Sequence, residues 1–194
     1  SLLFAAAFCI KKKLEIAAAF CGFGMLILGM HFMSDALSPL QVFPQTAQFL
    51  LYFSNPFYGL FAGTVVTALL QSSSASVGIL QALSLTGSVT IASAIPIVLG
   101  QNIGTCVTAL LACIGTGKNA RRTAFIHLYF NLTGALFLLA VFYGLDAAFS
   151  FSFLEKAASP AGIAMIHTAF NLLCTILLYP FSGCLAHLAR RTVR

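Results

Sequence analysis

The sequence predicts an all-α integral membrane protein, and three observations lead to this fold class. Of the 194 residues, 60% are hydrophobic and only 7% are charged, with a mean hydropathy of +0.99. A soluble domain has about a quarter charged residues, so water is not the main solvent of this chain. The apolar residues form runs that are long enough to cross the roughly 30 Å core of a bilayer as helices. The basic residues gather at the ends of these runs, as is typical of the cytoplasmic ends of membrane helices.

The N-terminal segment, residues 1–13, is expected to contain the end of a preceding, truncated membrane helix and a cytoplasmic loop. It is apolar from its first residue, it has no basic leader, and it ends in three lysines at positions 11–13. Residues 14–33 follow as the first complete span, with His31 near its end. We assign no function to this histidine.

Two more complete spans are predicted nearer the C-terminus, at residues 123–145 and 161–181. The second closes at a proline and leads into a basic tail, residues 186–194, which we place in the cytoplasm. Between residues 34 and 56, prolines and polar residues surround a short apolar run at 49–53. This pattern predicts an interfacial loop and helix.

Residues 57–85 are expected to form a re-entrant helical hairpin. Two apolar arms, residues 57–70 and 77–85, flank a polar tip at residues 71–76. Each arm has about ten to fourteen residues, which makes about 15 to 21 Å of helix and falls short of the bilayer core. The arms are therefore predicted to enter the membrane and return on the same side.

Residues 91–115 are expected to cross the membrane as a broken helix. Glycines and polar side chains interrupt the apolar sequence at residues 100–105, where a broken backbone would free carbonyl and amide groups as ligands. Residues 14–33 cross the membrane once between the basic clusters at 11–13 and 118–122. These clusters therefore face the same side only if residues 57–117 make one further net crossing. A hairpin followed by one broken span satisfies this condition.

The two polar interruptions predict a shared binding site, because irregular backbone at membrane depth is tolerated only where protein or a water-filled cavity satisfies it. Sodium prefers carbonyl, amide and hydroxyl oxygens, whereas phosphate is bound by hydrogen-bond donors and helix N-termini. The simpler interpretation is that these hydroxyls only bond neighbouring backbone or join helices. The predicted sodium ligands are Gln71, Ser72, Ser73, Gly100, Asn102 and Thr105. The predicted phosphate ligands are Ser72, Ser73, Ser74, Ser76 and Asn102.

The last two predicted spans share the pattern His-x-x-Phe-Asn, with His127 and Asn131 in one and His167 and Asn171 in the other. Residues four apart share a helix face. One interpretation is a proton-sensitive or ligand-orienting pair, and the other is an interhelical hydrogen bond that holds the scaffold. We favour the scaffold interpretation. A metal site is disfavoured because no carboxylate lies near either pair in the sequence.

The two polar segments also resemble a known family. Residues 63–75 read GTVVTALLQSSSA, and residues 95–105 read IPIVLGQNIGT. Together they resemble the signature of the type II sodium/phosphate cotransporters of the bacterial type, and the resemblance covers most of residues 14–185. It implies the C-terminal one of two inverted repeats, each with a Gln-Ser-Ser-Ser hairpin, which meet around a central sodium and phosphate site. Gln101 departs from the small residues typical of this position, so its role is left open.

The resemblance implies a sodium-coupled phosphate symporter in the cell membrane, with its C-terminus in the cytoplasm. Sodium would be the coupling ion, and no covalently bound cofactor is expected. Residues 14–185 would form one repeat, and the missing N-terminal repeat of the same transporter would be its partner, along with phosphate, sodium and the lipid bilayer. We expect neither a nucleic-acid partner nor enzymatic activity.

Three alternative functions are considered. A carrier or channel for another anion would use the same residue types, since serine-lined sites accept several oxyanions. A serine hydrolase is disfavoured, because the chain has no Gly-x-Ser-x-Gly elbow and no evident acid to orient His127. A non-transporting membrane scaffold would form a stable complex without solute flux.

Overall fold

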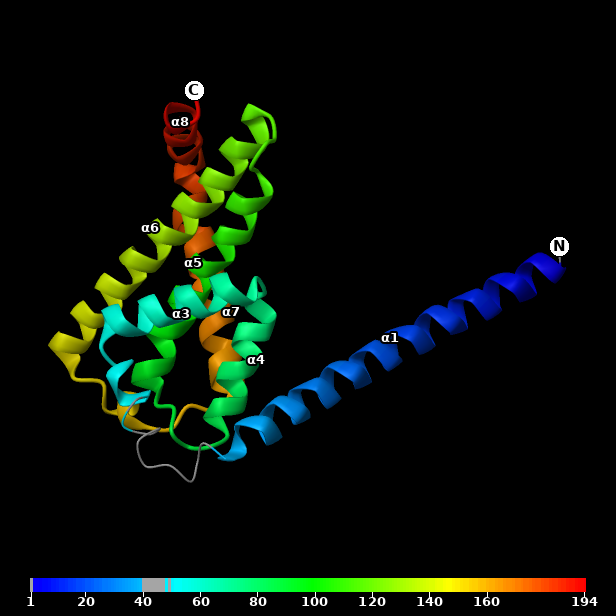
Figure 1. Ribbon diagram of the computed structural model, residues 1–194, viewed down its shortest axis with the longest axis horizontal. Coiled ribbons are helices and arrows are strands. Elements are labelled where there is room, and N and C mark those ends of the chain that lie inside the picture. The colour runs from blue at the N-terminus through cyan, green and yellow to red at the C-terminus, as the bar shows by residue number, and fades with distance from the viewer. Residues whose placement is uncertain (1, 40–47, 49) are drawn as a thin grey trace.

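The computed structural model describes residues 2–39, 48 and 50–194, and this part of the chain is helical (Figure 1). Its α-helices are α1 (Leu2–Leu37), α3 (Pro56–Leu70), α4 (Ser73–Ser84), α5 (Ile91–Ala112), α6 (Lys118–Phe149), α7 (Pro160–Leu178) and α8 (Ser182–Thr192). Two short 3₁₀ helices are η2 (Ser152–Glu155) and η3 (Tyr179–Phe181). Within the described residues, β-pairing is limited to an isolated bridge between Thr90 and Ala157.

Four helical segments are long and apolar enough to cross a membrane, which confirms the predicted class of all-α membrane protein. They are Lys12–Leu37, Ile91–Ala112, Lys118–Phe149 and Pro160–Thr192. The three complete spans predicted from the sequence all lie within these segments. The fourth segment is α5, the helix that the sequence predicted to be broken.

Helix α1 is a single long helix that projects away from the other helices and contacts α4 near its C-terminal end (Figure 1). The loop predicted within residues 1–13 is therefore wrong for residues 2–13, which continue the helix. Leucine, alanine and lysine all favour helix, and neither glycine nor proline occurs before Gly22 to end it.

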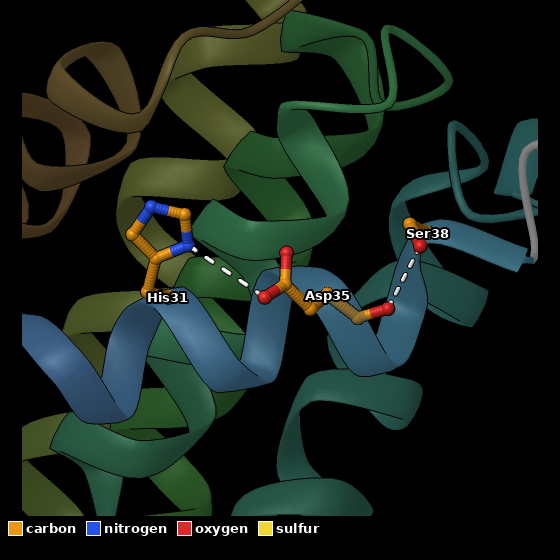
Figure 2. A network of polar contacts seen from close by, with 3 residues as sticks. All are labelled: His31, Asp35 and Ser38. Carbon is orange, nitrogen blue, oxygen red and sulfur yellow. Dashed lines mark hydrogen bonds and ion pairs between the residues drawn. The ribbon is translucent and has the colours of Figure 1, made fainter.

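The C-terminal end of α1 carries an exposed polar network (Figure 2). The Nδ1 atom of His31 lies 3.8 Å from Oδ2 of Asp35, and the Ser38 hydroxyl donates to the Asp35 backbone carbonyl at 2.8 Å. The His31 and Asp35 side chains are 76% and 72% exposed, so this pair contributes little to stability. The network marks the end of the apolar part of α1.

Of the interfacial segment predicted for residues 34–56, residues 40–47 and 49 lie outside the described residues, and residues 34–37 belong to α1. Residues 50–52 are helical, and Asn55 caps α3 by accepting the backbone N–H of Phe57 at 3.0 Å. Pro56 follows as the first residue of α3, where its missing N–H costs nothing.

Helices α3 and α4 form a helical hairpin whose turn is the polar tip. Gln71 ends α3 in the left-handed conformation, with φ = 55°. Ser72 caps α4, because its hydroxyl oxygen accepts the backbone N–H of Ala75 at 3.2 Å. The second arm begins at Ser73, before the predicted residue 77, since this cap starts the helix within the polar tip.

The segments that precede α3 and follow α4 lie together at one end of the helical bundle. Leu50, before α3, packs in one buried cluster with Val89, after α4, and with Ala158. Backbone hydrogen bonds join the same region, since the N–H of Ala158 donates to the Val89 carbonyl at 2.8 Å. The tip lies farther along α5, where Thr67 of α3 lies against Gly104.

Helix α5 is continuous from Ile91 to Ala112, so the break predicted at residues 100–105 is wrong. The glycines of this segment serve close packing instead. A Cβ atom added at Gly100 would clash with the backbone carbonyl of Leu60, and one added at Gly104 would lie 2.5 Å from the carbonyl oxygen of Thr64. Small residues allow two membrane helices to approach in this way without interrupting either helix.

Helices α6 and α7 pack against the opposite side of α5 and complete the core. A single buried cluster joins the three helices and η2. Its buried members are Ile95, Leu99, Ile103, Ala135, Leu139, Leu154, Phe170 and Cys174. These contacts fix the positions of α5, α6 and α7 relative to one another.

Replacing Gly100 with alanine is expected to lower the melting temperature of the detergent-solubilised protein. The added Cβ would overlap a backbone carbonyl, which cannot rotate away as a side chain can, and overpacking costs about 1–3 kcal/mol. The matched control is Gly144→Ala in α6, where nothing lies within 4 Å of the added atom. Thermal unfolding followed by size-exclusion chromatography measures both variants, and equal melting temperatures would contradict the packing described here.

Candidate functional site

A polar cavity of about 270 Å³ lies where α4, α5, α6 and α7 meet. Each of the four helices contributes at least one polar side chain to its wall. The lining residues are Ser73, Asn102, Thr105, His127, Phe130, Asn131, His167 and Asn171. The cavity therefore joins part of the predicted polar tip with part of α5 and with both His-x-x-Phe-Asn patterns.

Helix α5 contributes an amide and a hydroxyl to the cavity. The Asn102 side chain is only 6% exposed, and its Nδ2 donates to the Val98 carbonyl at 2.9 Å. The Thr105 hydroxyl donates to the Gln101 carbonyl at 2.9 Å, which leaves its oxygen lone pairs available. Both side chains thus present oxygen atoms from an intact helix and need no break in the backbone.

The two His-x-x-Phe-Asn patterns have the same local geometry in α6 and α7. Asn131 donates to the His127 carbonyl at 3.0 Å, and Asn171 donates to the His167 carbonyl at 2.9 Å. Asn171 also donates to Oδ1 of Asn102 at 3.3 Å, so one asparagine joins two helices. This bond is of the kind expected from the scaffold interpretation.

The two histidines were not among the predicted ligands, yet both line the cavity. Their backbone carbonyls accept the asparagine amides, but within the described part of the chain neither imidazole forms a hydrogen bond. Their ring nitrogens are therefore available to a bound molecule. The sequence indicated these residues through the repeated His-x-x-Phe-Asn pattern. The pattern did not predict that both copies line the same cavity.

The structure brings Ser73, Asn102 and Thr105 together, but it places other predicted ligands elsewhere. Gln71 is exposed in the turn of the hairpin, and Gly100 faces α3, where its carbonyl accepts the Thr64 hydroxyl at 3.1 Å.

Two more serines of the polar tip lie outside the cavity. The Ser72 oxygen is occupied in capping α4. Ser74 lines a neighbouring groove of about 610 Å³ between α1, α4 and α7, and His167 belongs to the walls of both spaces. The groove and the cavity are therefore adjacent.

Ser76 takes part in a buried hydrogen-bond network instead of lining the cavity. Its oxygen accepts the Thr67 hydroxyl at 2.8 Å and the Gln101 amide at 2.9 Å. Ser76 is 1% exposed and Gln101 is 2% exposed, and Oε1 of Gln101 has no hydrogen-bond partner among the described residues. This network connects both arms of the hairpin to α5 just behind the cavity.

Among the described residues, the cavity wall is polar and carries no Lys, Arg, Asp or Glu side chain. Its hydroxyl and amide oxygens suit a monovalent hard cation, while its N–H and O–H groups suit an oxyanion. Ser73 is the first residue of α4, so the positive end of that helix dipole also faces this region. A neutral site of this kind is able to hold an anion and a cation together.

Replacing Ser76 with alanine is expected to destabilise the protein. The substitution leaves the Thr67 hydroxyl and the Gln101 amide buried without their acceptor, which costs about 1–3 kcal/mol. The matched control is Ser74→Ala, an exposed position on the same helix where a change within about 0.5 kcal/mol is expected. Thermal unfolding in detergent compares the two, and a Ser76→Ala protein as stable as the parent would contradict the role of the network.

Comparison with known proteins identifies the family of this chain. The model of the Na+/Pi-cotransporter family matches residues 25–177. The protein YqeW of Bacillus subtilis, described as uncharacterized, is 30% identical over 170 residues, which cover 87% of this chain and 54% of YqeW. No solved structure matches the chain.

Mammalian proteins are also similar. Human sodium-dependent phosphate transport protein 2B is 33% identical over 147 residues, covering 66% of this chain and 21% of that protein. Rat sodium-dependent phosphate transport protein 2A is 41% identical over 92 residues, covering 44% of this chain and 14% of that protein. The chain thus spans about half the length of the Bacillus relative and less of the mammalian ones. Since the family match includes the hairpin and every residue of the cavity, this chain belongs to the Na+/Pi-cotransporter family.

Proposed function

We propose that this chain supplies one of two repeats of a sodium-coupled phosphate symporter and that the cavity forms its share of the substrate site. Family membership supports the class of transport. The residue assignment depends on one observation. Ser73, Asn102 and Thr105 line the same neutral polar cavity as the two His-x-x-Phe-Asn patterns. Residues 14–185 make up the proposed repeat.

Phosphate is assigned to the side of the cavity at the start of α4. There the Ser73 hydroxyl and the backbone N–H groups of Ser73 and Ser74, which precede the first paired amide of the helix, supply donors, and the helix dipole favours negative charge. The imidazoles of His127 and His167 face the same space and are able to donate one hydrogen bond each in the neutral form. Ser72 and Ser74 flank this position, but Ser72 caps α4 and Ser74 lines the neighbouring groove, so Ser73 is the serine assigned to phosphate in the cavity.

Sodium is assigned to the oxygen atoms on α5, namely Oδ1 of Asn102 and Oγ1 of Thr105, with Ser73 shared between ion and anion. These are the hard donors that sodium prefers. A cation here would also offset the charge of the phosphate, since no basic side chain lines the cavity. We centre the proposal on these residues because Gly100 and Ser76 are engaged in other contacts.

We further propose that the α3–α4 hairpin enters and leaves the membrane from the outer side and that the C-terminus is cytoplasmic. Two observations support this topology. The segments that precede α3 and follow α4 pack together in one buried cluster, while the tip lies partway along α5. The start of α6 and the end of α8, which lie at the opposite end, carry basic residues.

Substitution of Ser73 or Asn102 by alanine in the full-length transporter is expected to impair sodium-dependent phosphate uptake while leaving expression intact. Loss of a ligand at a buried site costs about 1–3 kcal/mol, which corresponds to an apparent affinity weaker by roughly fivefold to more than a hundredfold. Uptake of radiolabelled phosphate at varied sodium and phosphate concentrations measures the effect.

The matched control is Ser182→Ala, an exposed position at the start of α8. Unchanged uptake kinetics in both cavity variants would overturn the residue assignment. Strong inhibition of uptake by sulfate would show that the site accepts oxyanions in general and would favour a carrier for another anion.

The proposed topology predicts the side from which introduced cysteines react. Ser54→Cys and Thr86→Cys flank the hairpin and are expected to react with a membrane-impermeant maleimide in intact cells. Thr116→Cys, between α5 and α6, is expected to react only after permeabilisation. The measurement uses a background in which the native cysteines are replaced, and labelling of Ser54→Cys and Thr86→Cys from opposite sides would exclude a re-entrant hairpin.

A further inference from the structure

The charged side chains that the structure describes at the start of α6 and the end of α8 are all basic. Six of the ten Lys and Arg residues of the chain are found there: Lys118, Arg121, Arg122, Arg190, Arg191 and Arg194. The acidic residues nearest in sequence are Asp146 and Glu155, which lie at and beyond the other end of α6. This end of the molecule is therefore a concentrated positive surface next to apolar spans.

A cavity of about 360 Å³ lies within this surface, between α6 and α8. Two arginines, one from each helix, lie in its wall together with two polar and two small or apolar residues. The lining residues are Asn119, Arg122, Thr123, Ile126, Ala186 and Arg190. None of them lines the proposed transport cavity.

Two hydrogen bonds hold the end of α8 against α6 and so fix the shape of this cavity. The Nε atom of Arg122 donates to the Val193 carbonyl at 3.2 Å, and the hydroxyls of Tyr129 and Thr192 lie 2.7 Å apart. Within the described residues, the two terminal nitrogens of Arg122 form no hydrogen bond, and neither Arg122 nor Arg190 has a carboxylate partner. Two arginines thus line one cavity without a counter-ion among the residues that the structure describes.

We propose that this cavity binds the phosphate headgroup of an anionic phospholipid from the adjacent leaflet. Guanidinium groups bind phosphate oxygens in a forked geometry, and basic pockets between membrane helices on the cytoplasmic side suit lipid headgroups. Ile126 and Ala186 give the cavity an apolar side, and the apolar surface of α6 continues from there toward the bilayer core. A diacyl lipid is able to contact the arginines with its phosphate and the apolar side with its acyl chains. A soluble anion is able to contact only the arginines.

The test is a lipid titration of the purified full chain in detergent. Binding of dioctanoyl-phosphatidylglycerol is followed by native mass spectrometry, with dioctanoyl-phosphatidylcholine as the uncharged comparison. The double variant Arg122→Gln, Arg190→Gln is expected to weaken phosphatidylglycerol binding at least tenfold, because each basic residue near an anionic lipid contributes about fivefold. If the double variant is unstable, phosphatidylglycerol binding is measured on the single variant Arg190→Gln, which changes an exposed position. Its binding is expected to weaken about fivefold.

The matched control is the double variant Arg191→Gln, Arg194→Gln, which removes the same charge from the same surface but from outside the cavity. Its binding is expected to change by less than about threefold. If both double variants lose the same affinity for phosphatidylglycerol, the lipid is attracted by the overall positive charge of this surface and not by the cavity, and the proposed site is wrong. Equal binding of phosphatidylcholine, or displacement of the lipid by millimolar inorganic phosphate, would also overturn it. None of these results depends on phosphate transport.

Discussion

The backbones of α3 and α5 lie so close together that a side chain at Gly63 or Gly100 would overlap the carbonyl groups of the facing helix. Lipid supplies no hydrophobic drive to press two apolar helices together, so this packing and its hydrogen bonds have to hold the short helix α3 in place. The Thr64 hydroxyl contributes to both, because it donates to the Leu60 carbonyl of its own helix and lies 3.1 Å from the Gly100 carbonyl. The position of the whole hairpin follows from this contact.

The buried network around Ser76 fixes the tip of the hairpin relative to α5 and therefore relative to the cavity. Thr67 and Gln101 both donate to one serine oxygen, so the two arms of the hairpin and α5 share a fixed geometry. Ser73 lies one helical turn before Ser76 and is thereby held at the cavity wall. The polar groups of the tip thus divide into Ser76, which is buried in a structural network, and Ser73, which lines the cavity. In the proposed site, only the group at the cavity wall would contact an ion or phosphate.

Charge is distributed according to the cost of placing it in a bilayer. The central cavity is polar but neutral, whereas the basic residues lie at the end of the bundle formed by α6 and α8. In the proposed site, an anion and a cation would bind together, and no permanent buried charge would need to be stabilised when the site is empty. The arginines lie at one end of the bundle, where the headgroups and water of a surrounding bilayer would be able to solvate them.

The sequence alone determined the class of protein, the position of the four long apolar segments and the polar tip, because hydropathy, helix caps and charge bias are local properties. It did not determine whether the glycines of α5 break the helix or allow a neighbour to approach, since glycine is compatible with both and the choice depends on α3. Nor did it separate Ser73 from Ser76, or show that His127 and His167 share one cavity. Which face of a helix meets which neighbour is set by packing between segments that are distant in the chain. The tertiary structure therefore decided which of the many polar side chains belong to the candidate site.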